Sequence, residues 1–204
     1  MSASRTNTAP KANAREKLIA AAIATVRYNG FSATSVDEIC AGAGVTKGAF
    51  FHHFASKEAL AVAAASAWTD IAEQRIFTLP AWTRIADPLD RLIGHIEFRL
   101  SMLNGPAEDF TCFVGTVVQE AYNSSDPIRA ACDASITAYA ERLARDIEPA
   151  IEKYGVKDVS ALSLAYHVQA VLQGAFIIAK AKGSPEIARD SVAHLKRYIE
   201  MLFK

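Results

Sequence analysis

Apolar residues recur at helical spacing along most of the chain, and short polar, glycine- or proline-containing segments separate the runs. The first run ends at the stop signal Asn29-Gly30, and its apolar positions are Leu18, Ile19, Ala22 and Val26. Capping residues mark most of the later runs, as in the segment from Ser35 to Glu38, which has the spacing of a capping box.

This pattern predicts an all-α fold of about nine helices, with no strand and no internal repeat. The helix bounded by Asp126 and Tyr154 is expected to kink near Pro149. The predicted helices cover residues 13–29, 35–42, 46–53, 56–76, 87–104, 108–122, 126–154, 159–182 and 185–202.

Three regions follow from these elements. Residues 1–12 are polar and are expected to form a flexible arm. Residues 13–60 form an amino-terminal three-helix domain, and residues 61–204 form a larger helical domain. The fourth helix belongs to both domains, so the boundary near residue 60 is covalently continuous.

Composition supports a folded helical protein and adds a charge asymmetry. Hydrophobic residues make up 51% of the chain, which is ample for a core. Residues 1–60 hold seven Lys/Arg and four Asp/Glu, a net of +3, and residues 61–204 hold fifteen and eighteen, a net of −3. A basic amino-terminal region joined to an acidic remainder is typical of a protein that binds nucleic acid through the basic region. A neutral chain can also divide this way by chance.

The segment from Ser35 to Phe54 has the spacing of a helix-turn-helix. Gly44 supplies the conformational freedom that the turn needs. The second helix offers backbone N–H groups at its amino end and side chains that suit phosphates and base edges. The candidate DNA-binding residues are Ser35, Thr46, Lys47, Gly48, Ala49, Phe51, His52 and Lys57.

The sequence of residues 34–60, TSVDEICAGAGVTKGAFFHHFASKEAL, resembles the signature of the TetR family of bacterial repressors. The resemblance implies a homodimer that binds a near-palindromic operator on double-stranded DNA and releases it when a small molecule enters the carboxy-terminal domain. One position departs from the family pattern. The family usually has a tyrosine that contacts phosphate where this chain has Phe51, so His52 and Lys57 are expected to carry more of the backbone contact.

A ligand pocket is expected in the carboxy-terminal domain, because aromatic and amide side chains lie together on its helices. No acidic or basic cluster is evident there, so a neutral or weakly polar effector is expected. The same residues can also be core aromatics and surface amides. The candidate ligand-binding residues are Phe98, Met102, Gln119, Tyr122, Tyr139, Tyr166, Gln169, Gln173 and Phe176.

The run from Val159 to Ala179 contains no charged residue and is long enough to span a bilayer. Its serine, histidine and glutamine residues favour instead a helix that is covered on both sides in a soluble protein. With the last helix it predicts a four-helix dimer interface, against the alternative of a monomeric core. The candidate interface residues are Ser163, Ala170, Gly174, Ala181, Leu195, Ile199 and Leu202.

Cys112 resembles the cysteine at the start of the sixth helix in a subgroup of TetR regulators, some of which respond to electrophiles or oxidants through the thiol. A helix amino end favours the thiolate, whereas Glu108 and Asp109 oppose it, and a buried inert cysteine is the alternative. The three cysteines lack the spacing of a disulfide framework or a zinc site, so neither a metal nor a cofactor is expected.

Other classes of protein receive little support. Nucleophile-elbow, phosphate-loop and HExxH motifs are absent from the sequence, which argues against an enzyme. No signal peptide opens the chain, so a cytoplasmic location is expected. Regulation by a partner protein, or activation in place of repression, remains compatible with the sequence.

Overall fold

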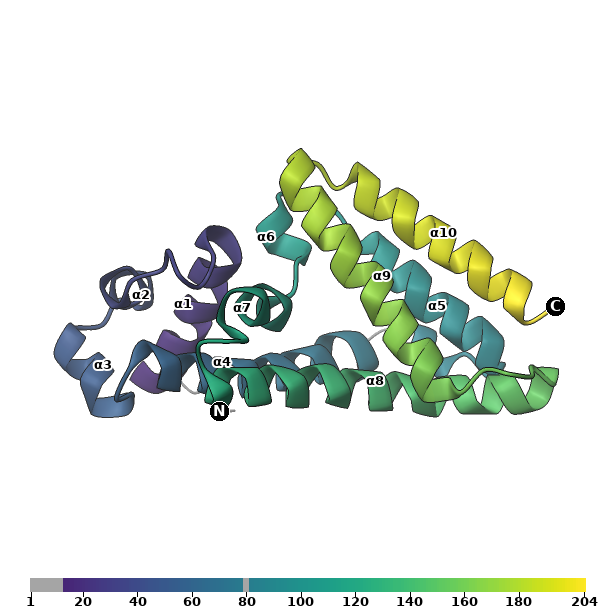
Figure 1. The fold of residues 1–204 in the computed structure, drawn as a ribbon, viewed down its shortest axis with the longest axis horizontal. Helices are drawn as coiled ribbons and strands as arrows, with labels where there is room; N and C mark the ends of the chain where they lie inside the picture. The colour runs from purple at the N-terminus through teal and green to yellow at the C-terminus, as the bar shows by residue number, and fades with distance from the viewer. Residues whose placement is uncertain (1–12, 79–80) are drawn as a thin grey trace, which may run out of the picture.

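The computed structural model describes residues 13–78 and 81–204, all of whose regular elements are helical (Figure 1). The predicted arm, residues 1–12, lies outside the described residues. The ten helices are α1 (Ala14–Asn29), α2 (Val36–Ala43), α3 (Lys47–His53), α4 (Lys57–Ala72), α5 (Pro88–Ser101), α6 (Ala107–Phe110), α7 (Phe113–Ala121), α8 (Asp126–Tyr154), α9 (Ala161–Lys182) and α10 (Glu186–Leu202). A π-helical stretch, Glu73–Thr78, extends α4, and a 3-10 turn covers Ala81–Arg84.

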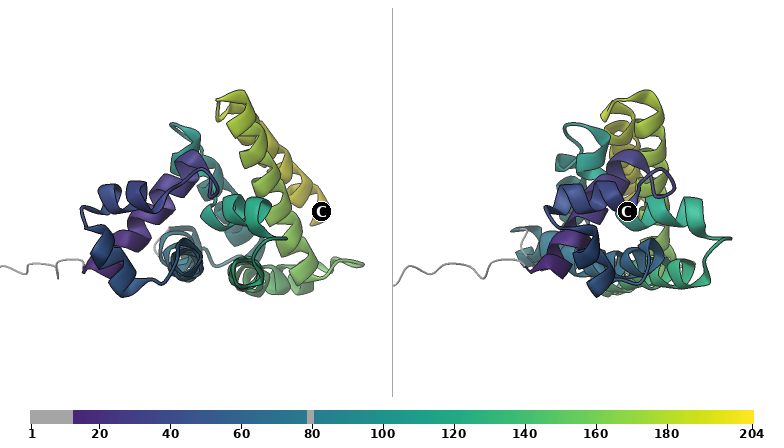
Figure 2. Two further views of the ribbon diagram at one scale, coloured as in Figure 1. Left: turned by 60° about the vertical axis from the view of Figure 1, so that its left-hand side comes forward. Right: turned by 90° about the vertical axis from the view of Figure 1, so that its left-hand side faces the viewer.

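The helices form an elongated molecule with two ends. Helices α1, α2 and α3 lie at one end, and α5, α9 and α10 lie at the other (Figure 1). Helices α4 and α8 pack side by side along the length of the molecule and join the ends. Helices α9 and α10 pack against each other on one side of the larger domain (Figure 2).

Two hydrophobic clusters organise these helices. One joins the amino-terminal helices to α7 and the start of α8, with Phe50, Phe113 and Ile128 among its buried members. The other fills the larger domain, where Leu92, Leu143 and Ile199 are fully enclosed. The amino-terminal domain is therefore packed against the second domain as well as joined to it through α4.

The structure adds a tenth helix because the predicted helix over residues 108–122 is broken. Thr111 and Cys112 are extended, so α6 ends at Phe110 and α7 begins at Phe113. Phe110 packs against Phe176 in one cluster, whereas Phe113 packs near Trp68 in the other. Side chains three apart on one helix share a face, so an unbroken helix could not serve both clusters.

Helix α8 is one long element that begins at a serine cap. Ser125 is its amino-terminal cap, because the Ser125 hydroxyl accepts a hydrogen bond from the Ile128 N–H. The helix continues through Pro149 as one element to Tyr154, and the kink expected near Pro149 stays a prediction (Figure 1).

Helix α9 is long and apolar enough to cross a membrane by length and composition alone. In the structure its wide apolar face is buried in the core of the larger domain, through Leu164, Ala165, Val168, Leu172 and Ala175. This burial agrees with the prediction of a helix covered by protein on that face.

Candidate nucleic-acid interface and ligand pocket

Helices α2 and α3 are held in place by local bonds that the sequence specifies. The Ser35 hydroxyl accepts from the Glu38 N–H, while the Glu38 carboxylate accepts from the Ser35 N–H. Gly44 has φ 64° and ψ 38°, the left-handed conformation that ends α2. The Thr46 hydroxyl accepts from the Ala49 N–H and caps α3.

Helix α3 buries one side and exposes the other. Phe50 is fully buried and Phe54 packs beside it, which fixes the rotation of the helix. Phe51 is 53% exposed, although it is a large apolar side chain. The other exposed predicted DNA-binding residues here are Thr46, Lys47, Gly48 and His52, and Ala49 is half-buried between them.

Lys57 is engaged within the amino-terminal domain. Its ammonium donates to the carbonyl oxygens of Phe31 and Thr34, both at 2.9 Å, and sits 4.4 Å from the centre of the Phe31 ring. Its predicted phosphate contact is therefore not supported, because most of its hydrogen-bonding capacity is used to hold the α1–α2 connection.

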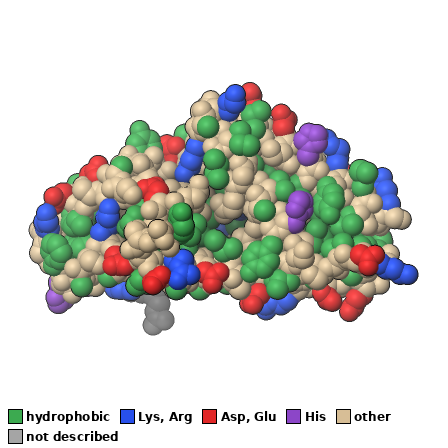
Figure 3. Space-filling model, viewed as in Figure 1, with side chains coloured by type: hydrophobic (Ala, Val, Ile, Leu, Met, Phe, Trp, Pro, Cys, Tyr) green, Lys and Arg blue, Asp and Glu red, His purple; other side chains and the backbone are tan. Residues whose placement is uncertain are grey.

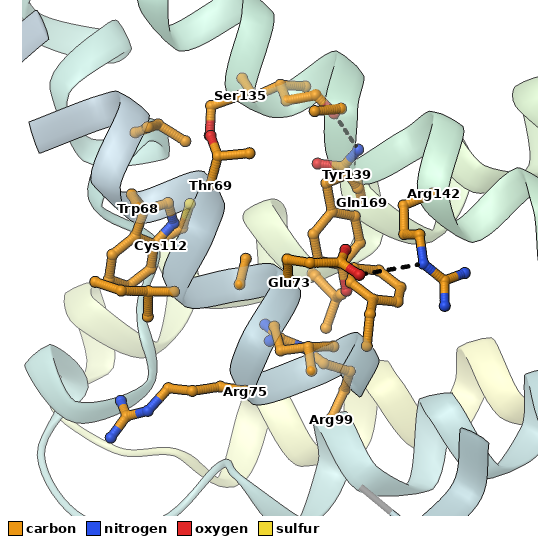
Figure 4. A pocket seen from close by; sticks show the side chains of 18 of the residues that line it. Trp68, Thr69, Glu73, Arg75, Arg99, Cys112, Ser135, Tyr139, Arg142 and Gln169 are labelled. Atoms are coloured by element: carbon orange, nitrogen blue, oxygen red, sulfur yellow. Dashed lines mark hydrogen bonds and ion pairs between the residues drawn. The ribbon is translucent and has the colours of Figure 1, made fainter. Parts of the chain in front are cut away.

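A cavity of about 290 Å³ lies between α4, α5, α6, α8 and α9. Its apolar walls include Trp68, Phe77, Phe110, Tyr139 and Phe176. Five of the nine predicted ligand-binding residues line it: Met102, Tyr139, Gln169, Gln173 and Phe176. Figure 4 shows Tyr139 and Gln169 approaching the cavity from one side and Trp68 and Thr69 from another.

Four predicted ligand-binding residues lie elsewhere. Gln119 lines a neighbouring cavity of about 210 Å³, which shares Thr111, Cys112, Gln173 and Phe176 with the first. Phe98 packs against the core, and Tyr122 is 59% exposed at the surface. Tyr166 is not among the residues that line either cavity, and its hydroxyl is 3.1 Å from that of Thr137.

The cavity also has charged walls, which were not predicted from the sequence. Its lining includes five arginines, Arg27, Arg75, Arg99, Arg142 and Arg145, and three acidic residues, Asp70, Glu73 and Asp109. The premise behind a neutral effector, that no charged cluster is present, is therefore wrong. One of these charges was predictable from the sequence, because Arg99 has the spacing that places it on one face of α5 with His95 and Met102.

Some polar groups in or beside the cavity wall already have hydrogen-bond partners. His95 is fully buried, and its Nε2 lies 3.1 Å from the Tyr139 hydroxyl. Burial, and then the charges of Arg99 and Arg142, lower the pKa of His95 to about 3. The Gln169 amide donates to the Ile136 carbonyl oxygen at 2.9 Å.

Two contacts join the cavity region to the amino-terminal domain. Arg27 on α1 lines the larger cavity, and its Nε donates to the Thr111 carbonyl oxygen at 2.9 Å. Glu120 on α7 accepts from the N–H groups of Phe31 and Ser32, in the connection that leads to α2. The break between α6 and α7 is thus bonded to the domain that carries α3.

Cys112 stands at this break, directly before α7, and lines both cavities. It is a free, half-buried thiol, whereas the other two cysteines, Cys40 and Cys132, are buried. Burial also raises the pKa of Cys132, to about 11. Cys112 is therefore the most accessible thiol among the described residues.

Of the predicted dimer-interface residues, the structure leaves those on α9 at the surface and packs those on α10 into the subunit. Ser163, Ala170 and Ala181 are exposed and Gly174 is half-buried, but Leu195 and Ile199 are buried in the core of the subunit and Leu202 packs against it. The outward face of α10 instead carries Ile187, His194, Tyr198 and Met201, whose spacing places them on one side of the helix.

Both parts of the chain match known families. Residues 18–64 match the model of the bacterial regulatory proteins of the tetR family, and residues 88–195 match the tetracyclin repressor-like carboxy-terminal domain. The transcriptional repressor NemR of Escherichia coli K12 is 26% identical over 91% of this chain and 93% of its own length. The transcriptional regulator LmrA of Bacillus subtilis is 26% identical over 81% of this chain and 86% of its own length.

Solved structures give the same result. The reduced form of E. coli NemR superposes with a TM-score of 0.75 at 26% identity, covering 91% of this chain and 96% of that one. The regulatory protein TetR of Rhodobacter sphaeroides superposes with a TM-score of 0.77 at 25% identity, covering 90% and 97%. The named relatives are regulators of transcription, a role that is not enzymatic. With its helix-turn-helix and its helical second domain, this chain belongs to the TetR family of bacterial transcriptional regulators.

Proposed function

We propose that this chain is a cytoplasmic repressor that binds a near-palindromic operator as a homodimer and releases it when a small molecule enters the 290 Å³ cavity. The observation that carries the proposal is the bonding between the two sites. Arg27 and Glu120 tie the helices around the cavity to the domain that exposes α3.

The DNA contact is proposed for the exposed side of α3 and its amino end. Lys47 pairs with Asp37 at 3.0 Å, but both side chains are well exposed, so the pair is weak and its ammonium is free to turn to a phosphate. Thr46 lies beside it at the cap. Phe51 and Ala49 offer apolar surface suited to a thymine methyl group.

The DNA contact is tested by selecting bound sequences from random duplex DNA and then measuring affinity by fluorescence anisotropy. Lys47→Ala and His52→Ala should each weaken binding about tenfold, and Lys47→Ala should also reduce the salt dependence. Lys157→Ala removes an exposed lysine of the α8–α9 connection and is the matched control. Equal affinity in all three variants would contradict the proposed interface. Transcription in vitro then separates repression from activation.

The homodimer is proposed to form through the outer faces of α9 and α10. Exposed apolar side chains gather there: Leu162, Tyr166, Ile177, Ile178, Ile187, Tyr198 and Met201. Hydrophobic side chains cover much of this part of the molecular surface (Figure 3). The His167 and Tyr198 rings lie 5.1 Å apart and join the two helices into one surface. Exposed apolar patches of this kind mark association surfaces.

A second function is favoured by one observation: Cys112 lines both cavities as a half-buried free thiol. In this alternative, the thiolate of Cys112 adds to the activated carbon–carbon double bond of an electrophile that enters a cavity. The carbon–sulfur bond forms as the π bond breaks, its electron pair moves to the conjugated carbonyl oxygen, and the resulting enolate takes a proton from water. The adduct then strains the α6–α7 break. The solved structure of E. coli NemR is described as its reduced form, and that description applies to NemR alone.

The alternative is tested with 1,4-benzoquinone. Peptide mass spectrometry should find the adduct on Cys112, and DNA release should be lost in Cys112→Ser. Cys40→Ser, in a thiol that is buried in the amino-terminal core, is the control. Release that persists in Cys112→Ser excludes the thiol mechanism and leaves the reversible ligand as the effector.

A further inference from the structure

The larger cavity contains an arginine without an acidic partner. Arg99 projects from α5, and its Nε is buried with no hydrogen-bond partner. Its Nη1 lies 3.9 Å from the Met102 sulfur, and the guanidinium carbon lies 5.9 Å from the centre of the Phe176 ring. A partly buried cation without a counter-charge is costly, so this one is suited to an anion that arrives from outside.

The acidic residues that line the cavity do not fill this role. Asp70, Glu73 and Asp109 are all exposed. Glu73 pairs with Arg142 at 3.6 Å, and Arg142 pairs also with Asp146, so these charges are matched among themselves. Figure 4 shows Arg99 extending toward the middle of the labelled side chains, whereas Arg75 points away from them. Arg99 is therefore the cation best placed inside the cavity.

A second unpartnered group faces the same space. Thr111 lines the cavity and is 1% exposed, yet its hydroxyl oxygen has no hydrogen-bond partner. Buried hydroxyls are almost always hydrogen-bonded, so an empty donor here indicates that a ligand supplies the acceptor. Thr111 is also the residue whose carbonyl oxygen binds Arg27, so a ligand at its hydroxyl would act on the contact to α1.

The remaining walls define the rest of the ligand. Trp68, Phe77, Phe110, Tyr139 and Phe176 provide apolar and aromatic surface. The volume of about 290 Å³ lies at the lower end of the range for small-molecule pockets, which selects a compact ligand. An apolar body with one anionic group matches both the walls and the unpaired arginine.

We propose that the cavity binds a compact monocarboxylate with an apolar or aromatic body, with Arg99 anchoring the carboxylate and the Thr111 hydroxyl donating a second hydrogen bond. The inference rests on the proposed function, because it names the class of effector for the same cavity. A planar carboxylate is the natural partner of a guanidinium, which can donate two parallel hydrogen bonds to it.

The test uses matched pairs of compounds and titration calorimetry on the full chain. The probes are 3-phenylpropionate, octanoate and 1-naphthoate, each compared with its primary amide. The amide keeps the shape of the acid and removes its charge. At least one carboxylate should bind about tenfold to a hundredfold more tightly than its amide. Arg99→Met should remove that difference while leaving the amide affinity unchanged.

Two further variants keep the test decisive. Arg99→Lys retains the charge and should keep part of the preference even if Arg99→Met folds poorly. Arg129→Met removes an exposed arginine of α8 that pairs with Asp126, and it is the matched control. An amide that binds as well as its acid, a preference that survives in Arg99→Met, or no binding by any of the carboxylates overturns the proposal.

DNA release is measured separately on the same compounds. A carboxylate that binds with the expected preference but does not release operator DNA contradicts the proposed function and leaves the ligand class standing. A neutral amide that releases DNA as well as its acid has the opposite meaning, because the cavity then controls DNA binding without selecting an anion.

Discussion

Arg27 donates a hydrogen bond of 2.9 Å to the carbonyl oxygen of Thr111, 84 residues further along the chain. The donor lies on α1, next to the helix-turn-helix, and the acceptor lies at the break between α6 and α7. The Arg27 guanidinium also lies 5.0 Å from the centre of the Trp68 ring, and burial lowers its pKa. The bond therefore joins the amino-terminal domain to the wall of the larger cavity.

This relationship predicts that Arg27→Met uncouples the two sites. The variant should bind operator DNA within about threefold of the wild type, because Arg27 lies away from the exposed side of α3. The loss of DNA affinity caused by an effector should shrink at least about fivefold, the low end of measured coupling energies. Fluorescence anisotropy with and without ligand measures both quantities.

The control is Arg129→Met, which should release DNA as the wild type does. Removing Arg27 leaves the Thr111 carbonyl oxygen unpaired at a cost of about 1–3 kcal/mol, so the folded fraction is checked first by urea unfolding. Full release in a folded Arg27→Met variant would falsify the coupling role.

Glu120 gives a prediction about stability and pH. Burial acts to raise the pKa of its carboxyl, but hydrogen bonds from the Ser32 and Phe31 N–H groups outweigh burial and lower it. A lowered folded-state pKa means that this stabilisation is present above the unfolded value and is lost as the pH falls through the folded value. Glu120→Gln should therefore cost about 1 kcal/mol at pH 7, a figure discounted because the residue is exposed.

Urea unfolding of the wild type and Glu120→Gln at pH 7 and at pH 3 measures this difference. The gap between the two proteins should narrow at the lower pH, because the lowered pKa of Glu120 makes the unfolded wild-type chain take up a proton before the folded one. Glu152→Gln, at an exposed position on α8, controls for the loss of one surface charge. A gap of the same size at both pH values contradicts the assignment.

The helix-turn-helix was predictable because its determinants are local. Ser35 and Glu38 are three residues apart and cap α2 by themselves, and Gly44 ends it through its own backbone freedom. Thr46 caps α3 in the same way. The internal bonds of Lys57 were not predicted because its partners, the Phe31 and Thr34 carbonyl oxygens, lie more than twenty residues away in the sequence and become neighbours only after folding.

The cavity and the outer face of α10 were harder to predict because they depend on contacts between distant helices. The break at Thr111 has no glycine or proline to mark it, and it arises because Phe110 and Phe113 enter different hydrophobic clusters. On α10, Leu195 and its neighbours form a clear apolar stripe, but periodicity does not tell whether such a stripe meets the same subunit or another one.

The burial of His95 leads us to expect that the folded protein loses stability in mild acid. Its ring is stacked on Phe77, with centroids 5.5 Å apart, and burial is the main reason that its pKa falls to about 3. Between pH 6.5 and pH 3 the unfolded chain takes up a proton that the folded chain excludes, so the free energy of unfolding falls with falling pH. This group contributes about 1.4 kcal/mol per pH unit in that window.

His95→Gln should flatten the dependence of the unfolding free energy on pH between 6.5 and 4, while keeping an acceptor within reach of the Tyr139 hydroxyl. Urea titrations at several pH values measure the slope. His52→Gln, at an exposed position on α3, is the matched control. A slope in His95→Gln equal to that of the wild type would show that His95 is protonated in the folded protein.

A substitution at Gly174 can test the pairing of subunits without disturbing the fold of the single subunit. A Cβ atom built at Gly174 meets no atom within 4 Å in the single chain, so Gly174→Leu should fold. The position lies among the small exposed residues of α9, where a second α9 could approach closely only without a large side chain. The variant should run as a monomer in light scattering after gel filtration. Operator affinity should fall about a hundredfold, because the second half-site no longer binds as part of the same complex.

Ala134→Leu adds a similar volume at an exposed position on α8 and should remain a dimer with full affinity. If Gly174→Leu also remains a dimer, the subunits pair through another surface, and the exposed apolar side chains of α9 and α10 need a different partner. If it becomes a monomer but keeps its affinity, one α3 helix is sufficient to hold the operator. Only monomer formation together with lost affinity supports the proposal that pairing through α9 is needed for the two α3 helices to bind the operator together.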